Sequence, residues 1–154
     1  MELKRTKCFA VIGIIVSALA LICTAILIVM LNLEIGYDVT DGKTGDQVAR
    51  AIVGVIFVGL LLVVLCGFAI YAALEGGIVL ALSSKGRRVG ALHIVSAVIK
   101  FLAAPSIFLL GALVLGLGFW LVGAVGIFFS ACFILLGIFD VSSFKEGKKL
   151  GRLK

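Results

Sequence analysis

The sequence predicts an all-α integral membrane protein: a four-helix antiparallel bundle with both termini in the cytoplasm. Composition is the first observation, because 63% of the 154 residues are hydrophobic and only 14% are charged. A soluble domain averages about 45–50% apolar and about 25% charged residues. The second and third observations are long runs almost free of charge and short blocks of basic residues beside them. Together they exclude a soluble enzyme and predict a single membrane domain over residues 1–154.

The number of spans follows from the length of helix that crosses a bilayer. A hydrocarbon core of about 30 Å requires about 20 apolar residues of helix. The apolar run from Val89 to Phe139 is too long for one helix, and its best break is Gly116-Leu117-Gly118. We predict spans at about 8–31, 51–82, 89–115 and 119–140, with an outer loop at 32–50, a cytoplasmic link at 83–88 and a basic tail at 141–154.

Basic residues predict the orientation. Three precede the first span, three lie in the link and five lie in the tail, which makes 11 of the 14 Lys and Arg residues on one side. The opposite side has only Lys43 and Arg50, in a loop rich in acidic residues. By the positive-inside rule both termini are cytoplasmic, and we expect a multi-pass protein of the plasma membrane.

Small residues predict how the spans pack. In lipid, helices associate closely where small side chains let the backbones approach each other. The first span has such residues at alternating spacings of three and four, and the second and fourth spans have similar sets. Four further glycines lie off these faces and leave room for another chain: Gly54, Gly59, Gly67 and Gly111.

The third span carries His93, Ser96 and Lys100 on the face where the other spans have small residues. A charge at the bilayer centre costs at least ~2.5–3.5 kcal/mol on insertion scales, so Lys100 requires a partner within the bundle. Folding the second and third spans about Gly86 places Glu75 opposite Val98, within a helical turn of Lys100.

Folding the third and fourth spans about Leu117 similarly sets His93 level with Asp140. We therefore predict two intramembrane polar pairs, Glu75 with Lys100 and His93 with Asp140. Supporting hydrogen-bond partners are Tyr71, Ser96 and Ser130, and Pro105 predicts a kink in the third span. Two interpretations remain open: the pairs determine which helices meet, or they form a proton or ion path.

No catalytic, cofactor-binding or metal-binding motif is found in the sequence. The four cysteines form no CxxC pair and no spacing typical of metal ligands, and His93 is the single histidine. The net charge of +6 is accounted for by the membrane rather than by nucleic acid. We expect a protein that is not an enzyme and has no cofactor.

Three segments carry a resemblance to a known class of proteins. They are Lys4-Arg5-Thr6 before a Gly-rich aliphatic helix, the sequence Lys85-Gly86-Arg87-Arg88-Val89-Gly90, and the helix from Gly126 to Gly137 that leads to a basic tail. The chain resembles small tetraspan membrane proteins of bacteria whose families have no assigned function. The resemblance implies a four-helix membrane fold and supplies no functional residues.

The function that we expect from the sequence is an accessory or assembly subunit without enzyme activity. Such a subunit packs within the bilayer against itself or a larger membrane complex, so the expected partners are membrane lipids and either a homo-oligomer or other membrane subunits. The alternative is a small oligomeric transporter or channel with a proton or ion path through Glu75, His93 and Lys100. A lysis or immunity protein is a third, weaker interpretation.

Overall fold

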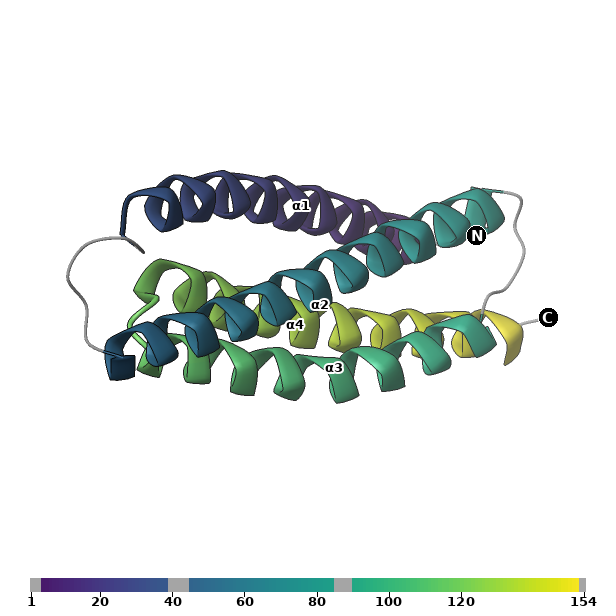
Figure 1. The fold of residues 1–154 in the computed structure, drawn as a ribbon. Helices are drawn as coiled ribbons and strands as arrows, with labels where there is room; N and C mark the ends of the chain where they lie inside the picture. Colours follow the sequence, from purple (N-terminus) through teal and green to yellow (C-terminus); the bar gives the residue numbers. More distant parts are fainter. Residues whose placement is uncertain (1–3, 39–44, 85–89, 153–154) are drawn as a thin grey trace.

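The computed structural model contains four α-helices joined by short connections (Figure 1). They are α1 (Lys4–Asp38), α2 (Gly45–Ser84), α3 (Gly90–Gly116) and α4 (Trp120–Arg152). The structure describes residues 4–38, 45–84 and 90–152. The centre of the predicted outer loop and most of the predicted cytoplasmic link lie outside these residues. The prediction of an all-α protein is confirmed.

Each of the four helices is long and apolar enough to cross a membrane. The segments that meet this criterion are Lys4–Leu31, Gly45–Ser83, Gly90–Gly116 and Trp120–Lys149. Large apolar side chains cover the outside of the helices, for example Val63 with 70% and Leu102 with 71% of its surface exposed. Such a surface suits lipid, in which an exposed apolar side chain has no cost. Three of the helices, α1, α2 and α4, also extend several residues beyond the predicted spans, because a helix can continue where its polar ends leave the hydrocarbon.

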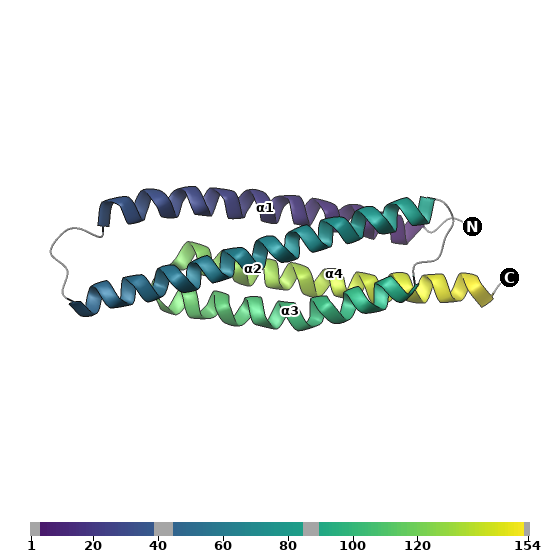
Figure 2. The same cartoon turned by 45° about the vertical axis from the view of Figure 1, so that its right-hand side comes forward.

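The helices pack as two neighbouring pairs. The most extensive contact joins α3 to α4, the next joins α1 to α2, and smaller contacts join α1 to α4 and α2 to α3. The beginning of α1 and the end of α4 lie at the same end of the bundle, as both views show (Figures 1 and 2). We call this the termini end.

The connection between α3 and α4 is a Schellman turn. Gly118 has φ of 98°, the N–H of Phe119 donates to the carbonyl of Val114, and the N–H of Gly118 donates to the carbonyl of Leu115. This pattern ends a helix with a residue in the left-handed region, which Gly adopts without steric cost. The turn reverses the chain between α3 and α4, at the position where the sequence predicts a break.

Glycines allow the closest approach within the α3–α4 pair. A Cβ atom added to Gly123 would lie 2.7 Å from the carbonyl oxygen of Gly111 and 2.8 Å from the backbone N of Leu115. Backbone atoms cannot move aside as a flexible side chain can, so this contact requires glycine. The prediction that Gly111 and Gly54 leave room for another chain is therefore wrong, because Gly111 packs against α4 and Gly54 against the ring of Phe119. Gly59 on α2 is different, because a Cβ atom added there would meet nothing within 4 Å.

This difference predicts opposite effects of alanine at the two glycines. We expect Gly123→Ala to lower the unfolding temperature in detergent micelles, because the α3 and α4 backbones must separate. Gly59→Ala should leave the unfolding temperature unchanged or raise it, since Ala is favoured over Gly in a helix by about 1 kcal/mol. Equal effects of the two substitutions would contradict the close contact between α3 and α4.

Candidate functional site

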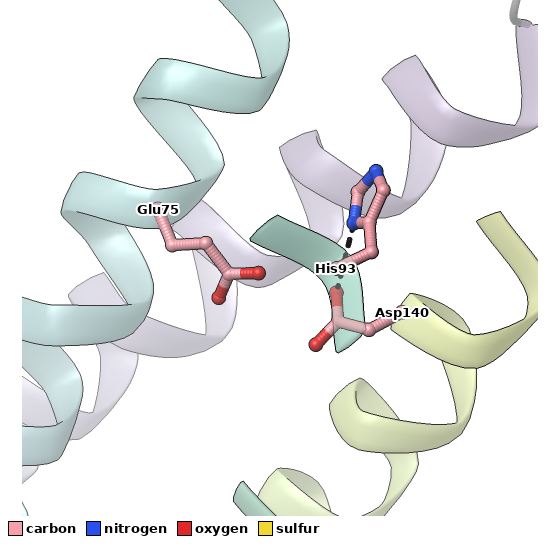
Figure 3. Close-up of side chains that lie close together, drawn as sticks. All are labelled: Glu75, His93 and Asp140. Carbon is pink, nitrogen blue, oxygen red and sulfur yellow. Dashed lines mark ion pairs between the residues drawn. The ribbon is translucent and has the colours of Figure 1, made fainter. Parts of the chain in front are cut away.

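Four polar side chains from three helices meet inside the bundle. Glu75 comes from α2, His93 and Lys100 from α3, and Asp140 from α4. They expose only 5, 5, 4 and 8% of their surfaces, respectively. We call these four residues the polar cluster, and Figure 3 shows how Glu75, His93 and Asp140 converge from their helices.

The ammonium group of Lys100 lies between the two carboxylates. Its Nζ atom is 2.6 Å from Oε2 of Glu75 and 2.6 Å from Oδ2 of Asp140. Both distances are short for charge-assisted contacts, which are about twice as strong as neutral hydrogen bonds. Through these two contacts, one side chain of α3 links α2 to α4.

His93 faces the other oxygen of the Asp140 carboxylate. Its Nδ1 atom lies 3.6 Å from Oδ1 of Asp140, which is longer than a hydrogen bond (Figure 3). Across residues 4–38, 45–84 and 90–152, this nitrogen has no hydrogen-bond partner. Because Ser96 interacts with the Glu75 carboxylate, the Nδ1 atom of His93 is the buried atom here that lacks a partner among the described residues, and such atoms are rare in folded proteins.

The charges of the polar cluster do not balance in their usual ionisation states. One ammonium stands against two carboxylates, so a neutral imidazole leaves one negative charge uncompensated. An isolated buried charge is very costly in a medium of low dielectric constant. A further positive charge within the polar cluster would remove this cost.

A small cavity adjoins the polar cluster on the side of α1. Its volume of about 20 Å³ exceeds the ~10–15 Å³ that one water molecule requires. Glu75, His93, Lys100 and Asp140 line it together with Thr6 and other residues of α1 and α4. One water molecule can therefore reach the polar cluster's charged groups.

Two contacts hold α1 against α4 beside this cavity, which Thr6, Phe9 and Phe139 help to line. The rings of Phe9 and Phe139 stack with centroids 4.4 Å apart and an interplanar angle of 5°. The backbone N–H and the hydroxyl of Thr6 both donate to Oε2 of Glu146, at 3.2 and 2.8 Å. Separation of α1 from α4 at these contacts would open the cavity.

The side chains of Glu75, His93 and Asp140 have donor atoms within 4.8 Å of one another, a spacing that can hold a metal ion. However, the ammonium of Lys100 lies 2.6 Å from a carboxylate oxygen of each acid. It already provides the cation between the two acids. The donor set therefore does not fit a metal ion while Lys100 keeps this position.

The structure joins the two predicted pairs into one cluster. Lys100 contacts Asp140 as well as Glu75, whereas the sequence predicts Asp140 as the partner of His93 alone. Ser96 is fully buried at the polar cluster.

Two predicted supporting residues are placed differently. The hydroxyl of Ser130 donates to the carbonyl of Ala104 at 2.7 Å and therefore ties α4 to α3 outside the polar cluster. Tyr71 is half-buried and does not line the cavity. Pro105 lies inside α3, which continues past it to Gly116, and away from the polar cluster.

Sequence reasoning missed the contacts between α1 and α4. Thr6 and Glu146 are 140 positions apart, and nothing in either segment predicts their pairing. The only signal is the presence of Glu146 as a lone acid within a basic tail.

No protein-family model, curated protein or solved structure significantly matches this chain. The chemistry of the site therefore rests on the geometry of the polar cluster and its cavity.

The central position of Lys100 predicts unequal effects of substitutions within the polar cluster. Lys100→Met removes the one side chain that contacts both carboxylates, and breaking a buried ion pair in this way costs about 3–5 kcal/mol. Asp140→Asn and Glu75→Gln each leave a balanced ammonium–carboxylate pair and should cost less. Thermal unfolding in detergent micelles measures this order, with Asp46→Asn at the exposed start of α2 as the control. A smaller loss for Lys100→Met than for either acid substitution would contradict it.

Proposed function

We propose that this protein is a small membrane transporter or channel, with an ion path that passes through Glu75, His93 and Lys100. Its four helices form an antiparallel bundle, and the termini end faces the cytoplasm. The observation that carries this proposal is the unbalanced charge of the polar cluster, in which one ammonium meets two buried carboxylates. With both acids ionised, the second carboxylate leaves one negative charge that Lys100 does not compensate.

The surroundings of the polar cluster support an ion path. The cavity of about 20 Å³ lies beside the uncompensated charge, and so does the Nδ1 atom of His93, which has no hydrogen-bond partner in the part of the chain that the structure describes. Ionisable residues within membrane spans commonly mark ion pathways and proton relays. The contacts of Thr6 with Glu146 and of Phe9 with Phe139 close the path on the cytoplasmic side in this conformation.

An accessory subunit that packs against itself or a larger membrane complex is the second candidate function. Gly59 and Gly67 support it, because both lie on the exposed outer face of α2 and a Cβ atom added to either would meet nothing within 4 Å. Val63 lies between them at a spacing of four and is 70% exposed. The two glycines are eight positions apart and therefore on one helix face, where small residues let another transmembrane helix approach closely.

Ion flux into liposomes tests the transport function. Protein reconstituted in liposomes should conduct a cation when a membrane potential is applied, measured with pH-sensitive and cation-sensitive dyes. His93→Gln removes the imidazole without adding a fixed charge and should reduce this flux at least tenfold. The control Asp46→Asn should conduct like the natural chain. A folded natural protein without any cation flux would contradict the proposal.

Native mass spectrometry of the purified protein tests the second candidate. Stable association with unrelated membrane subunits supports an accessory role over a transporter or channel, whereas a homo-oligomer is expected of both candidates. Gly59→Leu places a large side chain on the outer face of α2 and should weaken association through that face. Unchanged association in Gly59→Leu would contradict the assignment of this face as the interface.

A further inference from the structure

We propose that the polar cluster binds one proton, shared between His93 and Asp140, while Lys100 remains a fixed counter-charge. The cargo of the ion path is then a proton rather than a metal ion. Proton binding follows from the polar cluster alone, and only its use in transport rests on the proposed function.

The net charge of Glu75, Lys100 and Asp140, when all three are ionised, predicts how many protons the polar cluster binds. With Glu75 and Asp140 ionised and Lys100 protonated, a neutral imidazole leaves a net charge of −1 from the three ionised groups. Addition of one proton to the imidazole gives two positive and two negative charges. The polar cluster then has no net charge, which is the favoured condition in a surrounding of low dielectric constant. A divalent cation would instead leave the polar cluster with a net positive charge.

The position of His93 indicates that the proton binds to its Nδ1 atom. The side chain of His93 is 6% exposed. Its Nδ1 atom has no hydrogen-bond partner within residues 4–38, 45–84 and 90–152, and it faces Oδ1 of Asp140 at 3.6 Å. This is the oxygen of Asp140 that does not contact Lys100, whose ammonium lies beside Oδ2. An imidazolium would donate from Nδ1 to Oδ1, and the attraction would shorten the distance toward the ~2.7–2.9 Å of charge-assisted bonds. The proton enters from water and leaves to water, and no other bond is formed or broken.

The other acceptor for this proton near His93 is Glu75, because a carboxylate oxygen of Glu75 lies within 4.8 Å of the ligand atoms of His93 and Asp140. Glu75 on α2 faces Lys100, which lies on α3 and contacts both acids. On α4, Asp140 and Ser143 line the cavity, and on α1, Thr6 and Phe9 line it. Within the part of α1 that the structure describes, no charged side chain lines the cavity. Asp140 is therefore the acid that faces the imidazole directly.

The space beside the polar cluster excludes larger cations. Calcium takes six to eight oxygen ligands, and magnesium keeps several of its waters. The cavity of about 20 Å³ holds one water molecule, and much of its wall is apolar, including Phe9, Leu136 and Phe139. A proton needs no volume and only one acceptor atom.

The single histidine makes this proposal directly testable. Protein labelled with ¹⁵N-histidine in lipid nanodiscs gives the NMR signals of one imidazole, that of His93. At neutral pH we expect the signature of an imidazolium, in which both ring nitrogens carry hydrogen. A neutral imidazole in the natural chain would overturn the proposal.

Charge-removing variants give a second, independent comparison. In Asp140→Asn and in Glu75→Gln the remaining acid balances Lys100, so the imidazole should lose the extra proton and its signals should change to the neutral pattern. Asp46→Asn removes an exposed acid at the beginning of α2, far along the helix from Glu75, and should leave the imidazolium unchanged. An imidazolium that persists in both cluster variants would also overturn the proposal.

The two proposals fail in distinguishable ways. An imidazolium in a protein that carries no protons across liposomes supports the proton site and contradicts only the transport function. Cation flux together with a neutral imidazole supports transport and contradicts the assignment of the proton to His93.

Discussion

The ammonium group of Lys100, held between Glu75 and Asp140, is the interaction on which the rest of the structure depends. It lies ten residues into α3, about 15 Å from the beginning of that helix. Within a membrane such a charge must be compensated by neighbouring helices, because lipid supplies no counter-ion. Each of its two contacts, both 2.6 Å long, reaches a different helix. The depth and rotation of α2, α3 and α4 relative to one another are therefore constrained by one side chain.

The packing of α3 against α4 brings Lys100 and Asp140 close enough to interact. The Schellman turn at Gly118 reverses the chain, and the contact of Gly111 with Gly123 brings the two backbones together near that turn. From there the helices run side by side toward the termini end (Figure 2). Lys100 and Asp140, which are 40 positions apart, consequently reach the same depth. The small residues near the turn at Gly118 thus bring α3 and α4 together, and the polar cluster forms between these helices nearer the termini end.

Much of the fold could be predicted from the sequence because lipid imposes simple limits. Span length, the Gly-rich break near residue 117 and the scarcity of charge along the spans predict four helices without any knowledge of side-chain contacts. Depth could also be predicted, since counting from a turn places Glu75 near Lys100 and His93 near Asp140. The rotation of each helix about its axis and the reach of a long lysine side chain could not be predicted in this way. For that reason Lys100 bridges two acids, Ser130 bonds to Ala104, and Tyr71 lies away from the cavity. Counting from turns also relates only consecutive helices, so the contact of Thr6 with Glu146 could not be predicted.

Solid-state NMR in lipid bilayers tests the central interaction most directly. Recoupling between the ¹⁵N of lysine side chains and the ¹³C of aspartate and glutamate carboxyl groups reports which pairs lie in contact, and Lys100→Arg identifies the signal of Lys100. The structure predicts that the Lys100 nitrogen couples strongly to one aspartate and one glutamate carboxyl carbon at the same time. A Lys100 nitrogen that couples to neither carbon would contradict the bridging role of this side chain.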